Sequence, residues 1–357
     1  MMKNIPFVIN ILIILITYIV LIAAHELGHF FIFKKNNIKM RALFITVFMF
    51  IKENGSWKFG FKPNKITAIG GIAIPDVDSV KDEDDFKKIQ RSFARALIAG
   101  PVTSILFGLI SVGIVLTFIL IVKNSYLSSM LFTIAFSIVM ITLFIIITSF
   151  FKNEIVIGDF PAYKMAKIDE FFVAIQYYHY AFFSTNFEKV REENKYLKFV
   201  LYKGLAKKLE EKNLHIYTLQ IIDTLLVEYL AGVIKEIPEE LDNYVDFLLN
   251  NDKAFNKVKD SEQVMILWFN IVRLLYINRC DKERAVELFE NIKMMVDEEN
   301  MVVKYKIKQT EHLLGIKDNS EYLKEKKNIS ISSADGLYKN FEGYYADEMK
   351  LNEGLGI

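Results

Sequence analysis

A charge-free hydrophobic segment near the N-terminus leads directly into the sequence His-Glu-Leu-Gly-His at residues 25–29. Residues 5–24 contain no Asp, Glu, Lys or Arg. Two histidines four positions apart lie on the same face of an α-helix, so the imidazoles of His25 and His29 can converge on one ion. Glu26 stands beside the first histidine and can take a proton from a water molecule at that ion. The spacing is therefore typical of a zinc site.

The apolar surroundings place this motif inside a predicted membrane span. Ionisable side chains at bilayer depth are costly, and they are usually functional where they occur. If the span ends near Phe33, His25 lies about 12 Å below the interface at 1.5 Å per residue. We therefore predict an intramembrane metal site. The alternative is an amphipathic or pore-lining helix whose histidines only form hydrogen bonds, but that reading leaves Glu26 unexplained.

Two further runs, residues 96–122 and 124–151, also lack charged side chains. The 357-residue chain is 52% hydrophobic and 24% charged, so its charges must be concentrated elsewhere. The net charge of +1 and the absence of a basic cluster give no reason to expect nucleic acid as a partner. A single cysteine excludes an internal disulfide and a cysteine-based zinc site. The predicted spans are residues 5–33, 95–122 and 126–151.

The positions of Lys and Arg predict the orientation of the chain in the membrane. Residues 34–92 carry several of them next to both flanking spans, whereas the opposite side offers only Lys3 and Lys123. We therefore predict a multi-pass protein of the cell membrane with its N-terminus outside. Residues 34–92 and the C-terminal part are then cytoplasmic.

Residues 42–75 have the composition of a small β-sheet. Aromatic and β-branched residues flank Asn54-Gly55, which is a strong hairpin signal. A further strand is predicted around Gly70-Gly71, and Pro75 indicates that this strand lies at an edge of the sheet. Glycines allow another backbone to approach closely, so an extended substrate can pair with this edge. The alternative is an ordinary pair of turn glycines.

Asp159 is the candidate for a third metal ligand. It lies between Gly158 and Pro161, which break a helix and expose the carboxylate. A metal held by two histidines and open to water needs one more protein ligand, and a carboxylate is usual in hydrolytic sites. The alternative role of Asp159 is to cap the following helix. Other candidate ligands are Glu154, Asp169 and His179.

Four segments together carry a family resemblance. They are HELGH at 25–29, IGGIAIP at 69–75, RALIAGPVTS at 95–104 and GDFPA at 158–162. In these segments, which cover roughly the first 165 residues, the chain resembles the site-2 protease family of intramembrane zinc metalloproteases.

This resemblance implies that His25, His29 and Asp159 hold Zn²⁺ and that Glu26 is the general base of peptide hydrolysis. Three features depart from the family pattern. Phe160-Pro161 follows the aspartate where the family usually has glycine, Ser104 stands where the family often has a substrate-contacting Asn, and no insertion of PDZ size separates the second and third spans. We predict that Ser104, together with Gly70 and Gly71, contacts substrate.

The C-terminal half has the composition of a soluble helical protein. Residues 184–327 show apolar side chains at three- and four-residue spacing, which predicts a cytosolic helical domain. Residues 328–357 are rich in Ser, Gly and Asn and are expected to form a loosely ordered tail. The aromatic run at 171–183 is too short to span, so it lies at the membrane interface or packs under the helical domain. We assign residues 1–183 to the membrane domain.

The sequence therefore predicts a mainly α-helical, polytopic membrane protein with a small β insertion and a soluble helical domain. The leading functional hypothesis is an intramembrane zinc endopeptidase that acts on membrane-anchored proteins in the lipid bilayer. Its helical domain is expected to bind a cytosolic protein partner, or to recruit or regulate substrate. The alternatives are a non-proteolytic scaffold with the same fold and a membrane metallopeptidase that processes small secreted peptides.

Overall fold

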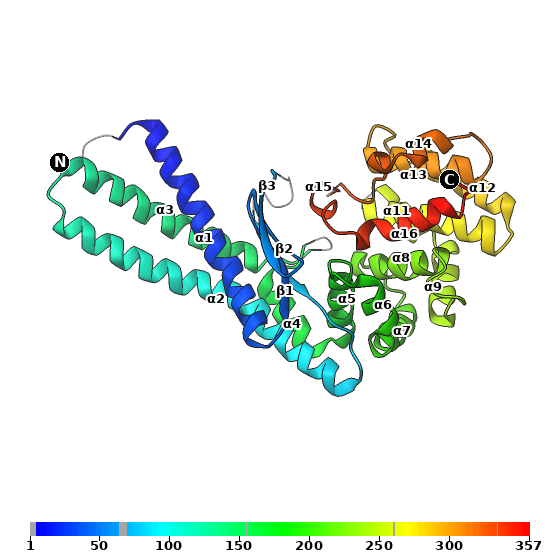
Figure 1. Ribbon diagram of the computed structural model, residues 1–357, viewed down its shortest axis with the longest axis horizontal. Helices are drawn as coiled ribbons and strands as arrows, with labels where there is room; N and C mark the ends of the chain where they lie inside the picture. Colours follow the sequence, from blue (N-terminus) through cyan, green and yellow to red (C-terminus); the bar gives the residue numbers. More distant parts are fainter. Residues whose placement is uncertain (1–4, 64–69, 154–155, 260, 334) are drawn as a thin grey trace. The chain divides into compact units, whose positions relative to one another are not determined.

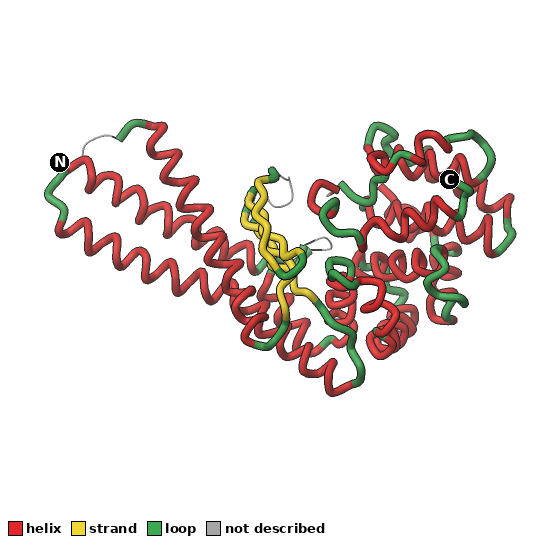
Figure 2. The backbone as a smooth tube through the Cα atoms, viewed as in Figure 1, coloured by secondary structure: helices red, strands yellow, loops and turns green. Residues whose placement is uncertain are grey.

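The chain forms two compact units. The structure is a computed structural model that describes residues 5–63, 70–153, 156–259, 261–333 and 335–357. The first unit contains the residues before Ser79 together with Asp82–Val173, and the second contains Ser79–Lys81 and Ala174–Ile357. The described residues are mainly helical, and their strands belong to one small sheet (Figure 2). This confirms the predicted fold class.

Three helices of the first unit are long and apolar enough to cross a membrane. They pack against one another and are the long blue, cyan and green helices of Figure 1. The predicted count of three spans is confirmed. The bounds are α1 (Phe7–Lys35), α2 (Glu83–Ile121) and α3 (Ser125–Ser149).

Helix α2 begins twelve residues before the predicted span. Asp82 caps it by accepting a hydrogen bond from the backbone N–H of Asp85, and acidic residues occupy its first turn. Phe86 and Phe93 are buried in this charged part. The helix therefore extends beyond its charge-free segment because its first turns are amphipathic and well capped.

The sheet of the first unit has four antiparallel strands in the order β3-β2-β1-β4. Strand β1 is central and almost wholly buried. Strands β1 and β4 both pack against α1. The bounds are β1 (Lys39–Ile45), β2 (Phe48–Glu53), β3 (Ser56–Phe61) and β4 (Gly71–Asp76).

The predicted hairpin is confirmed at Asn54-Gly55, which joins β2 to β3. Both residues have positive φ, 49° and 82°, as a type I′ turn requires. Strand β4 lies at an edge of the sheet and contains Pro75, as predicted. The sequence did not separate β1 from β2, because the turn between them at Thr46 has no Gly or Pro.

Helix α4 (Asp159–Ile168) follows the third span and packs against α2. The side chain of Gln90 on α2 donates a hydrogen bond to the carbonyl of Ala166 at 2.9 Å. Helix α5 (Glu170–Ala181) begins in the first unit and ends in the second. The α2–α4 contact fixes where the start of α4, and with it Asp159, lies in the first unit.

The secondary-structure elements among the described residues of the second unit are all helices. Helix α11 is its centre: residues 264–273 are all buried, and α8, α12 and α13 pack around them. The helices are α6 (Phe187–Glu193), α7 (Lys195–Glu210), α8 (Ile216–Leu230), α9 (Glu239–Leu249), α10 (Asp252–Asn256), α11 (Glu262–Arg273), α12 (Lys282–Lys293), α13 (Met301–Leu313), α14 (Ser320–Lys324), α15 (Asp335–Tyr338) and α16 (Gly343–Glu353).

One expectation for the C-terminal half is corrected, and one open alternative is decided for part of the aromatic run. Residues 328–357 do not form a loose tail: they contain α15 and α16, and Phe341 and Leu351 are 1% exposed. Apolar side chains spaced among the polar ones give these short helices a buried face. Within the aromatic run, Phe182 and Phe183 lie in the second unit and contact Tyr344, so this part of the run packs inside the helical unit.

Candidate metal centre

The structure brings His25, His29 and Asp159 together. The two histidines occupy successive turns of α1, and their Nε2 atoms are 3.2 Å apart. Asp159, in the first turn of α4, places Oδ2 3.1 Å from Nε2 of His25 and Oδ1 3.8 Å from Nε2 of His29. One ligand atom from each residue lies within 4.8 Å of the other two. This group could hold a metal ion.

Hydrogen bonds on the far side of each imidazole fix its orientation. Nδ1 of His29 lies 2.7 Å from the carbonyl oxygen of Ala96, which can only accept, so this nitrogen carries the proton. Nδ1 of His25 lies 2.9 Å from Oγ of Ser104, and that hydroxyl donates to the carbonyl of Gly100 at 3.1 Å. Ser104 is therefore the acceptor for an Nδ1 proton on His25.

With both Nδ1 atoms protonated, each Nε2 directs a lone pair toward the Asp159 carboxylate. Three groups that only accept hydrogen bonds then face one another in buried surroundings, an arrangement that a cation between them stabilises. Two imidazoles and a carboxylate suit zinc in a hydrolytic site, with the remaining position open to water. The donor set therefore fits the predicted metal.

Helix α2 forms the wall of the site through two glycine contacts. A Cβ atom added to Gly100 would lie 2.2 Å from Nε2 of His29 and 2.9 Å from Nε2 of His25. On α1, a Cβ at Gly28 would lie 2.6 Å from Oγ1 of Thr103. Glycine at both positions lets α1 and α2 approach closely enough for the Ala96 carbonyl to contact His29 and the Ser104 hydroxyl to contact His25.

Asp159 is positioned by the end of α3 and the turn after it. Gly158 precedes α4 in an extended conformation, and a Cβ there would lie 2.5 Å from the carbonyl oxygen of Ser149. Oγ of Ser149 donates to Oδ2 of Asp159 at 3.4 Å. The rings of Phe150 and Phe160 stack with centroids 4.2 Å apart. Phe160, which stands where the family usually has glycine, thus packs against the end of α3 and stabilises the turn that carries Asp159.

The structure does not support the alternative capping role of Asp159, and the described alternative ligands do not belong to the group that could hold a metal. The N-cap of α4 is Gly158, and the side chain of Asp159 points to the histidines instead of capping the helix. Asp169 follows α4 and accepts a hydrogen bond from the N–H of Phe172. His179 belongs to the second unit, and Glu154 lies outside the described residues.

Glu26 is 6% exposed and lies against strand β4. A Cβ atom on Gly71 would be 2.4 Å from Cγ of Glu26. The backbone N–H of Ala73 donates a hydrogen bond to the Glu26 carboxylate. The edge strand thus holds the candidate base in place, and glycine at position 71 makes room for its side chain.

The other two residues predicted to contact substrate have distinct surroundings. A Cβ atom added to Gly70 would have no neighbouring atom within 4 Å, and the Gly70 carbonyl accepts a hydrogen bond from the N–H of Thr46 at 2.8 Å. Ser104 is fully buried against His25. The described contacts of Ser104 therefore orient a histidine.

Sequence reasoning missed the roles of Gly100 and of the carbonyl of Ala96. Gly100 lies in the segment at 95–104 that carries the family resemblance, but nothing local indicated that its neighbours are imidazoles. A backbone carbonyl carries no sequence signal at all.

Comparison with known proteins gives one match. Residues 12–333 match the family described as peptidase family M50. No curated protein and no solved structure matches the chain.

Proposed function

The chain belongs to peptidase family M50, the site-2 protease family, and from this membership we propose an intramembrane zinc endopeptidase that cleaves membrane-anchored proteins. The family consists of zinc metalloendopeptidases of membranes. We further propose that His25, His29 and Asp159 hold the zinc and that Glu26 is the general base. One observation carries this proposal: the three ligand atoms converge within 4.8 Å, and both histidines lie with Glu26 on α1, a helix long and apolar enough to cross a membrane.

Zinc bound there supplies Lewis acidity, which polarises the scissile carbonyl and makes a water molecule more acidic. Glu26 takes the proton of the attacking water and passes it to the leaving amine. The N–H of Ala73 keeps the Glu26 carboxylate in a fixed orientation during this transfer. Ser104 and the Ala96 carbonyl keep both histidines in the tautomer that a cation needs.

A helical substrate cannot be cleaved as it stands, because its backbone carbonyls are already hydrogen-bonded and its scissile bond is shielded. The edge strand β4 offers backbone groups with which an unwound substrate segment can pair. Because β4 also contacts Glu26, a segment paired there would lie next to the candidate base. We therefore propose β-strand addition at β4, near Gly70, as the mode of substrate binding.

The distribution of Lys and Arg supports an N-terminus outside the cell and a cytoplasmic second unit. In that orientation the helical unit is available to cytosolic proteins. We propose that it recruits or regulates substrate.

The test measures zinc content and cleavage of a synthetic transmembrane substrate by purified protein in detergent. Wild type is expected to bind about one zinc per chain and to cleave. Glu26→Gln should keep the metal and lose cleavage, whereas Asp159→Ala should lose both. Glu83→Gln, the same chemical change as Glu26→Gln but at an exposed position of α2, is the matched control and should behave as wild type. Full zinc content and cleavage in Asp159→Ala would show that the third ligand lies elsewhere.

A further inference from the structure

A cavity of about 400 Å³ lies inside the second unit, apart from the metal centre. Its wall is formed by α5, α8, α11, α15 and α16 with the segments that follow α5 and lead into α15. The volume is in the range of sites that bind small molecules. The peptidase function assigns no role to this cavity.

The charged side chains in the described lining of this cavity are acidic. Its carboxylates are Asp223, Asp347 and Glu348, and its described lining contains neither lysine nor arginine. His179, the other ionisable nitrogen base there, is neutral near pH 7, because burial lowers its pKa to about 4. The cavity therefore offers no positive group to an incoming ligand.

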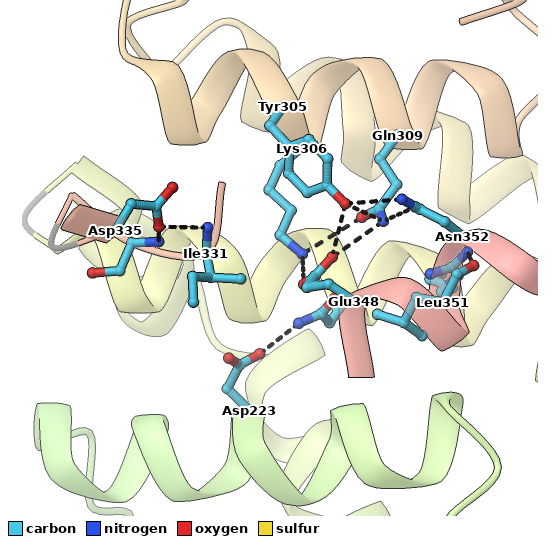
Figure 3. Close-up of polar contacts among 12 residues, drawn as sticks. Asp223, Tyr305, Lys306, Gln309, Ile331, Asp335, Glu348, Leu351 and Asn352 are labelled. Atoms are coloured by element: carbon cyan, nitrogen blue, oxygen red, sulfur yellow. Dashed lines mark hydrogen bonds and ion pairs between the residues drawn. The ribbon is translucent and has the colours of Figure 1, made fainter. Parts of the chain in front are cut away.

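Two of the three carboxylates are already paired with cationic side chains that do not line the cavity. Asp347 pairs with both terminal nitrogens of Arg191, at 2.5 and 3.1 Å. Glu348 pairs with Lys306 and accepts from Gln309 at 3.2 Å (Figure 3). These two acids hold the helices together.

Asp223 is different, because its contact in the described structure is to a neutral group. Its Oδ1 accepts a hydrogen bond from Nδ2 of Asn270 at 2.7 Å. In Figure 3, Asp223 points from α8 toward the network around Glu348. Burial raises the pKa of Asp223 to about 7, while Lys306 lowers it and Glu348 raises it. A partly buried carboxylate whose described contact is to a neutral amide is costly when it is charged, so a cation in the cavity would stabilise it.

Aromatic rings form another part of the lining. Tyr344 stacks on Tyr338 with centroids 4.4 Å apart and meets Phe183 edge-on at 4.9 Å. All three rings line the cavity. Burial raises the pKa of Tyr344 well above its usual value, so its phenol is neutral. Aromatic faces attract cations and accommodate apolar groups.

We propose that this cavity binds a small organic ammonium ion, with the Asp223 carboxylate as its counter-ion and Phe183, Tyr338 and Tyr344 as its apolar wall. A ligand with both a cationic nitrogen and an aromatic ring fits both parts of the lining. The peptidase proposal does not depend on this site.

The test is calorimetric titration of the full-length protein in detergent at pH 8 with tryptamine and, separately, phenethylamine. Tryptophol and 2-phenylethanol, which replace the ammonium group by a hydroxyl, are the neutral comparisons. The amines should bind at least about tenfold more tightly than the alcohols, because a hydrogen bond to a charged partner is stronger than one between neutral groups. Titration of protein-free micelles corrects for partitioning into detergent.

Asp223→Asn keeps the shape of the side chain and removes its charge. It should weaken binding of both amines at least about tenfold and leave the alcohols unchanged. Asp84→Asn makes the same change at an exposed position and should have no effect. Phe183→Leu, a second variant that keeps the volume apolar, should weaken amine binding severalfold.

Equal affinity for amines and alcohols would overturn the proposal, as would unchanged amine binding in Asp223→Asn. Failure of both amines to bind the wild-type protein would overturn it as well. Because none of these readings requires zinc or cleavage, they are independent of the peptidase test.

Discussion

At the scale of single residues, the candidate metal centre depends on groups that are not ligands. The hydroxyl of Ser104 and the carbonyl of Ala96 accept hydrogen bonds from the Nδ1 atoms of His25 and His29. Such partners fix the tautomer and the ring orientation, and their loss typically lowers metal affinity by about 10- to 100-fold.

Ser104→Ala should therefore weaken zinc binding by about 10- to 100-fold while the protein still folds. Oγ of Ser104 is the partner of His25 Nδ1, so its removal leaves that ring without a fixed tautomer. Competition with a zinc chelator measures the change. Ser137→Ala is the matched control, because among the described residues the buried Ser137 hydroxyl bonds only to the carbonyl of Thr133 within α3. Equal zinc affinity in the two variants would contradict the positioning role of Ser104.

Asp223 gives the second unit a defined pH dependence. Its pKa is about 7 in the folded protein, because of burial, and about 4 in the unfolded chain. The folded state therefore binds the proton more tightly, and the stability from this group is complete below pH 4 and lost as pH rises to about 7.

Replacement by Asn removes this dependence. Between pH 4 and pH 8 the wild-type protein should lose up to about 4 kcal/mol of unfolding free energy relative to Asp223→Asn. Denaturation of both proteins across this pH range, in the absence of added amines, gives the measurement. A difference that stays constant with pH would contradict the assigned shift, and Asp84→Asn supplies an exposed comparison.

At the scale of elements, the site depends on how closely α1 and α2 approach. Gly100 faces both histidines, so any side chain there would occupy the space of the rings. Strand β4 closes the other side through Gly71 and Glu26. The two spans and the sheet edge thus form the site together.

Gly100→Ala should abolish zinc binding and cleavage. The added methyl group would lie 2.2 Å from Nε2 of His29, and the packed helices cannot move apart without losing other contacts. Gly113→Ala, also on α2 but with nothing within 4 Å of the added atom, should leave both properties intact. Zinc content and cleavage are measured on both variants. Normal zinc content in Gly100→Ala would show that the helices separate more easily than this packing implies.

The β2–β3 hairpin exposes an aromatic surface formed by Trp57, Phe59 and Phe61, which are 44%, 64% and 64% exposed. The ring of Trp57 lies 6.0 Å from that of Phe30 on α1. Aromatic residues beside a span are typical of the membrane interface. We therefore expect this hairpin surface to contact lipid.

In liposomes, brominated lipids should quench the fluorescence of Trp57, most strongly when the bromine lies near the headgroups. The measurement uses Trp268→Phe, which leaves Trp57 as the only tryptophan. Trp57→Phe is the reciprocal control, since Trp268 is 2% exposed and should be quenched little. Quenching of Trp57 by aqueous acrylamide but not by brominated lipid would refute lipid contact.

At the scale of the whole molecule, the two units have separate cores and separate polar networks. The candidate ligands all lie in the first unit, and the Lys306–Glu348 pair lies in the second. A ligand that binds only one folded unit stabilises that unit by mass action.

Zinc removal should therefore affect one unfolding transition only. In calorimetry, a zinc concentration of about 100 times Kd should stabilise the first unit by about 2.7 kcal/mol and leave the transition of the second unchanged. Asp159→Ala should abolish the zinc effect. If both transitions moved together with zinc, the two units would be unfolding as one cooperative body.

The sequence by itself determined the features that depend on neighbouring residues. The length of each charge-free run predicted three spans, because the bilayer thickness sets the length of a spanning helix. The spacing of His25 and His29 predicted that their rings share a helix face, and Asn54-Gly55 predicted a hairpin through its positive φ angles. The match to the family is consistent with the resemblance seen in these segments.

Only the tertiary structure decided which distant groups meet. Asp159 joins the histidines because α4 packs on α2, and the Ala96 carbonyl and Gly100 reach them because glycines let two spans approach closely. The cavity around Asp223 depends in the same way on α16, a helix formed by residues that the sequence had suggested were a loose tail. Periodicity and composition act over a few residues, whereas these contacts follow from packing between elements far apart in the chain.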